Sequence, residues 1–169
     1  AVAGSVMEIN PFDQPNVQEA KKKTQDALAE LASSGKLPEP PGADPASGVK
    51  NALASLQPGK DYIGILAFLP YDAAIEKSMR GLQSALRDRY KVAVTWGFGP
   101  RYLHSTGQLH KGGANNGVFF VLACGHSADL PIPGISFTFS QLARAQALGD
   151  LASLEGKGRR VVWVGLPDA

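Results

Sequence analysis

The residues best suited to chemistry gather in one segment, Gly97–Gly113. It contains two of the three histidines of the chain, His104 and His110, and five glycines. Glycines let backbone N–H groups approach an anion, basic side chains add positive charge, and a histidine exchanges protons near neutral pH. This composition fits a ligand-binding loop, and it fits a solvated loop capped by Ser105 equally well. The side chains of this segment that we consider for ligand contact are Arg101, Ser105, Thr106, Gln108 and Lys111.

The histidines do not form a metal-binding pattern. His104 and His110 are six residues apart, far from one face of a helix, and no carboxylate lies near them in the sequence. Cys124 and His126 follow each other closely at an expected strand end, where a small buried thiol is the more common arrangement. We therefore expect neither a metal nor a cofactor.

A second polar segment, residues 10–23, leads into an expected helix and ends on three lysines. Lys22 and Lys23 are typical of a solvated helix face. Lys21 differs, because at about 100° per residue it borders the apolar stripe that begins at Val17. A lysine held partly out of water can take part in proton transfer. The spacing therefore singles out Lys21 and predicts that it is partly buried.

Strands and helices that position these side chains alternate along the chain. The helix after the first expected strand has Asp72 as its cap, and a capping box of Thr138 and Gln141 starts a later helix. Strands separated by helices favour parallel pairing through right-handed crossovers. We therefore expect a three-layer α/β fold with a mainly parallel four-stranded sheet, preceded by a helical N-terminal segment. The expected strands are Tyr62–Leu69, Val92–Trp96, Gly117–Cys124 and Arg160–Leu166.

The chain divides into three parts by composition. A short apolar run, Ser5–Asn10, is expected to form a strand, and the helix after it is closed by Gly35. The prolines and glycines of residues 35–44 indicate a linker. We expect residues 1–34 to be the terminal strand and helix of a preceding domain and 45–169 to be a C-terminal α/β domain. Asp150 is expected to start one more helical segment near the end. The leaderless start at Ala1 favours a piece of a longer polypeptide.

Composition excludes several classes of protein. The chain is 44% apolar and 19% charged, with a net charge of +2. No apolar run reaches the roughly 18–20 residues of a membrane span, and the basic residues are interleaved with acidic ones rather than clustered for nucleic acid. A cytoplasmic protein that binds neither membrane nor nucleic acid is the expected class, and self-association into a homo-oligomer stays open.

Two motifs resemble a known family. Phe12-Asp13-Gln14-Pro15-Asn16-Val17, followed by Lys21, resembles the C-terminal signature Phe-Asp-Gln-x-Gly-Val-Glu-x-x-Lys of glucose-6-phosphate isomerases. It departs from that signature at Asn16 and Gln18. The run Leu103–Gln108 is similar to the histidine-bearing segment of the same family. The order of the motifs most resembles the C-terminal part of bacterial transaldolase/glucose-6-phosphate isomerase fusion proteins, and the resemblance covers nearly the whole chain.

The resemblance implies an aldose–ketose isomerase that interconverts glucose 6-phosphate and fructose 6-phosphate through an enediol, within a sugar-isomerase-like fold. It implies that Lys21 stands near the ring oxygen or the developing oxyanion, that Gln14 orients the sugar or its phosphate, and that His104 opens the ring. Arg101 and Lys111 are added as anion contacts from their charge and placement. The family's glutamate base and phosphate loop lie earlier, so upstream domains of the same polypeptide are expected partners and the isolated piece is expected to be inactive. The alternative is a non-catalytic phosphosugar-binding or domain-docking module.

Overall fold

The computed structural model describes residues 1–13, 15–40, 44–125 and 129–167. Two residues considered above, Gln14 and His126, lie outside the described residues. The elements, in chain order, are α1 (Val2–Val6), α2 (Pro15–Ser34), α3 (Pro45–Ala54), β1 (Tyr62–Phe68), α4 (Ala73–Tyr90), β2 (Ala93–Phe98), the short 3₁₀ helix η1 (Arg101–His104), α5 (Gly107–Gly112), β3 (Gly117–Cys124), α6 (Phe139–Gly156) and β4 (Arg160–Leu166).

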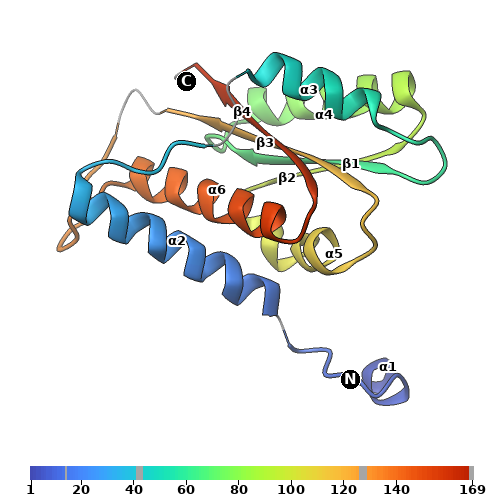
Figure 1. Ribbon diagram of the computed structural model, residues 1–169, viewed down its shortest axis with the longest axis horizontal. Helices are drawn as coiled ribbons and strands as arrows, with labels where there is room; N and C mark the ends of the chain where they lie inside the picture. Colours follow the sequence, from blue (N-terminus) through green and yellow to red (C-terminus); the bar gives the residue numbers. More distant parts are fainter. Residues whose placement is uncertain (14, 41–43, 126–128, 168–169) are drawn as a thin grey trace.

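The four strands form one parallel sheet in the order β2-β1-β3-β4, which confirms the predicted fold class. The bounds of β3 and β4 are those predicted from the sequence. Strand β2 extends beyond Trp96, because Gly97 and Phe98 still pair with β1. The connections after β1 and after β3 leave on opposite faces of the sheet, so helices cover both faces (Figure 1).

Successive side chains of each strand point to opposite faces of the sheet, and this divides the core into two halves. In β3, Phe119 and Val121 pack in the cluster with α6, whereas Val118 and Phe120 pack in the cluster with α4. Successive side chains of a strand point to opposite faces, so a continuous apolar run is required when both faces are covered. Helices α2, α5 and α6 lie on one side of the sheet, and α3 and α4 lie on the other (Figure 1).

Capping side chains define the starts of three helices, and the two starts predicted above, at Asp72 and Thr138, are confirmed. The carboxylate of Asp44 accepts hydrogen bonds from the first-turn N–H groups of α3, and that of Asp72 does the same for α4. Thr138 and Gln141 form the predicted capping box at the start of α6. Gly35 follows the end of α2 with φ of +74°, a left-handed conformation that glycine adopts without steric cost.

Two predicted elements are wrong. The run Ser5–Asn10 does not form a strand: Val2–Val6 is helical and turns follow it. A strand needs a neighbour for its backbone hydrogen bonds, and this segment lies away from every edge of the sheet (Figure 1). Helix α6 also runs unbroken through Asp150, which is completely buried rather than capping a new segment.

Helix α2 packs directly against α6. The contact is close because position 149 is glycine: a Cβ there would lie 2.5 Å from the Oγ1 atom of Thr24 and 3.0 Å from the carbonyl oxygen of Ala20. Ala20 also belongs to the hydrophobic core on this side of the sheet. The helix that we assigned to a preceding domain therefore shares a core with the α/β unit, and the assignment itself stays a prediction.

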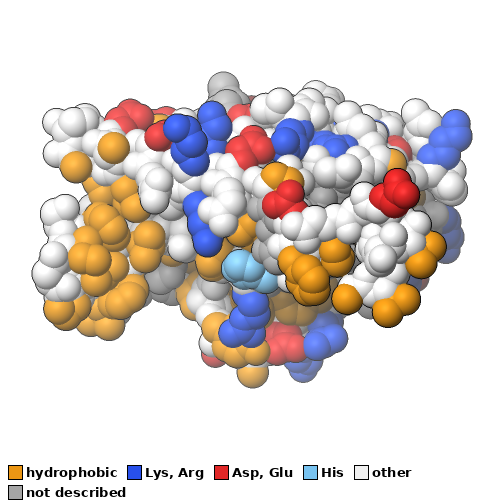
Figure 2. Space-filling view, turned by 90° about the horizontal axis from the view of Figure 1, so that it is seen from below, with side chains coloured by type: hydrophobic (Ala, Val, Ile, Leu, Met, Phe, Trp, Pro, Cys, Tyr) orange, Lys and Arg blue, Asp and Glu red, His pale blue; other side chains and the backbone are white. Residues whose placement is uncertain are grey.

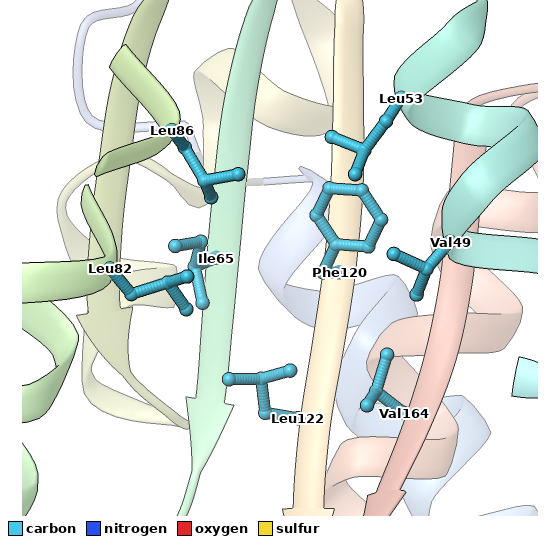
Figure 3. A pocket seen from close by; sticks show the side chains of 8 residues that line it. All are labelled: Val49, Leu53, Ile65, Leu82, Leu86, Phe120, Leu122 and Val164. Carbon is cyan, nitrogen blue, oxygen red and sulfur yellow. The ribbon is translucent and has the colours of Figure 1, made fainter. Parts of the chain in front are cut away.

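An apolar hollow of about 160 Å³ lies between α3 and α4 over the sheet (Figure 3). Its side chains converge from both helices and three strands, and none of them carries a polar group. A sugar phosphate would find no hydrogen-bond donor there, so we do not consider this hollow a candidate site. The lining residues are Val49, Leu53, Ile65, Leu82, Leu86, Phe120, Leu122 and Val164.

Candidate functional site

Two hollows lie around η1, the short helix that follows β2. The first, which we call the Lys21–His104 cavity, has a volume of about 330 Å³ and lies between α2, η1 and α6. Both residues that we predict to be catalytic line it, one from α2 and the other from the end of η1. The residues around the cavity are Val17, Ala20, Lys21, Thr24, Gln25, Leu28, Pro100, Leu103, His104, Leu142 and Gln146.

Helix α2 places Lys21 at this cavity through the packing of its apolar face. Val17 and Ala20 are buried against the body of the protein, and Lys21 follows directly at the edge of that contact. The predicted partial burial is wrong, because Lys21 is exposed. A lysine beside an apolar contact keeps its ammonium in water on a flexible stem, so the side chain borders the cavity without losing its solvation.

The described lining of the cavity offers a positive charge and a group for proton exchange but no carboxylate. Apart from the ammonium of Lys21 and the imidazole of His104, its polar groups are two amides, Gln25 and Gln146, and the hydroxyl of Thr24. The Thr24 hydroxyl donates to the carbonyl of Ala20 at 2.9 Å. No Asp or Glu is among the residues that line the cavity within the described parts of the chain. The site can therefore stabilise an oxyanion and move protons between oxygens, but its described lining holds no carboxylate base.

Glu19 does not supply the carboxylate that Gln18 lacks. Its carboxylate forms an ion pair with Lys157 at 2.9 Å, beyond the end of α6. Residues two apart on a helix point about 200° apart, so Glu19 and Lys21 face away from each other. The departure from the family signature at Gln18 is thus not compensated within this helix.

The second hollow, which we call the Trp96 hollow, lies at the end of β2 and has a volume of about 260 Å³. Three of the predicted binding residues, Arg101, Ser105 and Thr106, line it rather than the Lys21–His104 cavity. The structure therefore separates side chains that are adjacent in the sequence. The complete lining is Tyr71, Glu76, Arg80, Trp96, Gly97, Phe98, Arg101, Tyr102, Ser105 and Thr106.

Two further predicted binding residues, Gln108 and Lys111, face inward. Gln108 is half-buried, and its Oε1 atom has no hydrogen-bond partner among the described residues. Lys111 is buried and forms an ion pair with Asp150 of α6, so it is not placed where a ligand in either hollow would meet it. Lys111 is buried because α5 runs beneath the sheet toward α6, and it pairs with Asp150 because a buried lysine requires a partner charge.

The Lys111–Asp150 pair lies within a wider group of buried polar atoms. Burial lowers the pKa of the Lys111 ammonium and raises the pKa of the Asp150 carboxyl. The guanidinium of Arg159 donates to the carbonyl oxygens of Lys111 and Gly113, at 2.6 Å and 2.8 Å, and thereby fixes the end of α5. Sequence reasoning did not find Asp150 as a partner. The available signal was an aspartate within the apolar part of α6, a position where an unpaired charge is costly.

His110 is a core residue rather than an acid or base of the site. Its Nδ1 atom shares a hydrogen bond of 2.9 Å with the hydroxyl of Tyr62, and its ring packs edge-on against Phe119. Burial, with a smaller contribution from the charge of Lys111, lowers the pKa of His110 to about 4. The imidazole is therefore neutral at physiological pH. Within the described residues there is no group of three or more His, Cys, Asp or Glu side chains that could hold a metal ion.

The fold defines the class of domain: a three-layer α/β arrangement around a parallel sheet, as in Rossmann-like and sugar-isomerase-like folds. Among solved structures, the chain is similar to a hypothetical protein, TT0462, from Thermus thermophilus, with a TM-score of 0.56 and 18% sequence identity. The match covers 90% of this chain and 39% of that protein, so the chain spans about two fifths of its length. At this identity the likeness extends to the fold alone.

No protein-family model matches the sequence. The search of curated proteins gave no match either. Within the described residues, no helix has the length and apolar character needed to cross a membrane.

Proposed function

We propose that this chain is the C-terminal part of a glucose-6-phosphate isomerase, in the arrangement of a transaldolase/isomerase fusion protein. The observation that supports the proposal is the shared cavity of Lys21 and His104, two residues that the family resemblance selects from distant parts of the sequence. The α/β fold with its parallel sheet is compatible with a sugar-isomerase domain. The cavity volume of about 330 Å³ lies within the range of small-molecule sites.

In this proposal, His104 opens the sugar ring. The imidazole takes the proton of the C1 hydroxyl and delivers a proton to the ring oxygen as the bond between that oxygen and C1 breaks. The product is the open-chain aldehyde, and the imidazole ends in its starting protonation state. Proton transfer by a positioned side chain accelerates such a step by about 10²–10⁴-fold.

Lys21 then stabilises the enediolate. When a base removes the C2 proton, negative charge develops on the oxygen of the former carbonyl group at C1. The base then returns the proton to C1, and the proton of the C2 hydroxyl passes to the oxygen on C1 as the C2 carbonyl forms. An ammonium beside that oxygen lowers the energy of the intermediate, and the effect is strongest where water is excluded. Since the cavity lining contains no carboxylate among the described residues, the base comes from another part of the polypeptide, and upstream domains are the proposed partner. The substrates are intracellular sugar phosphates, so we propose a cytoplasmic location.

The test compares substitutions of the two proposed catalytic residues with a substitution of the neighbouring Lys22. We expect Lys21→Ala and His104→Gln to lower turnover of fructose 6-phosphate by about 100-fold or more in the natural polypeptide, as measured by a coupled assay for glucose 6-phosphate. Lys22→Ala removes the same charge from the solvent face of α2 and is the matched control, for which turnover should not change. Wild-type turnover in both the Lys21 and the His104 variants would contradict the site assignment.

A second candidate function is the non-catalytic phosphosugar-binding or domain-docking module. The observation that favours it is a set of exposed apolar side chains near the start of α6: Leu130, Ile135 and Phe139 are 65%, 49% and 54% exposed. Figure 2 shows apolar side chains gathered at one end of the face that it displays. Binding of glucose 6-phosphate by the natural polypeptide without any isomerase activity would favour this candidate over the enzyme.

A further inference from the structure

We propose that the Trp96 hollow binds a phosphate ester carried on a ring, independently of the Lys21–His104 cavity. Helix η1 lies between the two: Arg101 at its start lines the Trp96 hollow, and His104 at its end lines the other. The inference rests on the side chains of this hollow and does not depend on the proposed isomerase function. Three features carry it: two arginines held over aromatic rings, a cluster of aromatic faces, and a hydroxyl with no partner among the described residues.

Both guanidinium groups of the hollow are held in position by aromatic rings. The Cζ atom of Arg101 lies 5.0 Å from the ring centroid of Tyr71, and that of Arg80 lies 5.9 Å from Trp96. A cation at this distance from a ring face is attracted by the quadrupole of the ring. This attraction orders the guanidinium before an anion binds, so less side-chain entropy is lost on binding. Arginine also offers parallel donors that match the oxygens of a phosphate.

The charge balance of the hollow favours an anion. Arg80 forms an ion pair with Glu76 at 2.6 Å, so its charge is largely neutralised. Arg101 has no carboxylate partner in the parts of the chain that the structure describes. Two guanidiniums against one carboxylate leave one net positive charge, and it is centred on Arg101. The phosphate group is therefore expected beside Arg101.

A hydroxyl that lines the same hollow can donate to the phosphate. Thr106 lines the hollow, and its hydroxyl makes no hydrogen bond within the described residues. The neighbouring Ser105 hydroxyl already donates to the carbonyl of Tyr102 at 3.0 Å, so only its lone pairs remain. Thr106 and Arg101 are thus the two donors that we assign to the ligand.

The aromatic cluster indicates that the ligand also carries a ring. Phe98 lies between two other rings, with centroids 4.9 Å from Tyr71 and 5.3 Å from Trp96. Tyr71 is 70% exposed, and a large aromatic side chain at the surface beside a positive charge provides a face for stacking. A sugar ring and a nucleobase both stack on such faces. The shared chemistry is therefore a phosphate monoester on a ring, with sugar phosphates and nucleoside monophosphates as its two sources.

The experiment follows the indole N–H signals of the protein by two-dimensional NMR. The chain has two tryptophans: Trp96 lines the hollow, while Trp163 belongs to the core on the α6 side of the sheet and is an internal control. We expect glucose 6-phosphate or adenosine monophosphate to shift the Trp96 signal saturably and to leave the Trp163 signal in place. The unphosphorylated glucose and adenosine, and inorganic phosphate alone, are expected to bind at least about tenfold more weakly.

Substitutions then distinguish binding in the Trp96 hollow from a general effect of positive charge on the protein surface. We expect Arg101→Gln to raise the dissociation constant about tenfold or more, and Thr106→Val to raise it by a smaller factor. Arg89→Gln is the matched control, because Arg89 also lies over an aromatic ring, that of Tyr90, but outside the hollow. Binding of only one of the two esters identifies the source of the ligand. The proposal is overturned if neither ester shifts Trp96 at millimolar concentration, if inorganic phosphate binds as tightly as the esters, or if Arg101→Gln and Arg89→Gln have equal effects.

Discussion

Lys111 of α5 and Asp150 of α6 form an ion pair inside the molecule, with 1% and 0% of their side chains exposed. Removing two charges from water is costly, and their attraction offsets that cost only while both partners are present. The pair therefore joins α5 to α6 on the same side of the sheet that carries the Lys21–His104 cavity. It affects stability without contacting either hollow.

The first prediction concerns this pair. We expect Asp150→Leu or Lys111→Met alone to lower the free energy of unfolding by about 3–5 kcal/mol, because each leaves a buried charge without a partner. The double substitution should cost much less than the sum, since apolar side chains then replace both charges. Urea denaturation of the four proteins measures this coupling. Strictly additive effects would show that the two side chains do not interact.

The second prediction is a dependence of stability on pH that comes from His110. Its folded pKa of about 4 lies below the ordinary value of 6.5, so the unfolded chain binds the proton more tightly. The stabilisation is complete above pH 6.5 and is lost as the pH falls toward 4, by about 3 kcal/mol at most. Unfolding measured across this range should show a shallower slope for His110→Gln than for the wild type. A wild-type slope in His110→Gln would contradict this prediction.

The third prediction tests the close contact between α2 and α6. We expect Gly149→Ala to destabilise the protein by about 1–3 kcal/mol, because the added methyl overlaps Thr24 and the backbone of Ala20. Gly156→Ala is the matched control, since a methyl group at that end of α6 meets no atom within 4 Å. Thermal unfolding of the two variants provides the comparison. Equal stability of both would mean that the two helices are not in close contact.

The fourth prediction concerns the apolar hollow between α3 and α4. Val49→Ile adds one methylene group to that space and should stabilise the protein by up to about 0.8 kcal/mol. Val118→Ile makes the same chemical change at a completely buried position and should destabilise it, because no space is available there. Chemical denaturation distinguishes the two variants. A loss of stability in Val49→Ile would indicate that the hollow is closed in solution.

The sequence by itself determined the elements whose signals are local. The strand Gly117–Cys124 is an apolar run of the right length, and the capping box of Thr138 and Gln141 marks a helix start through side chains only three residues apart. The exception, Ser5–Asn10, has strand-like composition but no neighbouring strand, and backbone pairing cannot be read from one segment. The parallel direction of the strands followed from their alternation with helices, whereas their order in the sheet, β2-β1-β3-β4, came only from the structure.

Only the tertiary structure decided which side chains meet. The helical period gave the direction of Lys21 relative to its own helix, but the packing of α2 on α6 brought it to the same cavity as His104. Likewise, Arg101 and His104 are close in sequence yet line different hollows, and Lys111 turns to Asp150 in the core. Local patterns report the conformation of a segment, whereas a site depends on the relative placement of segments, which burial and close packing of the whole chain determine.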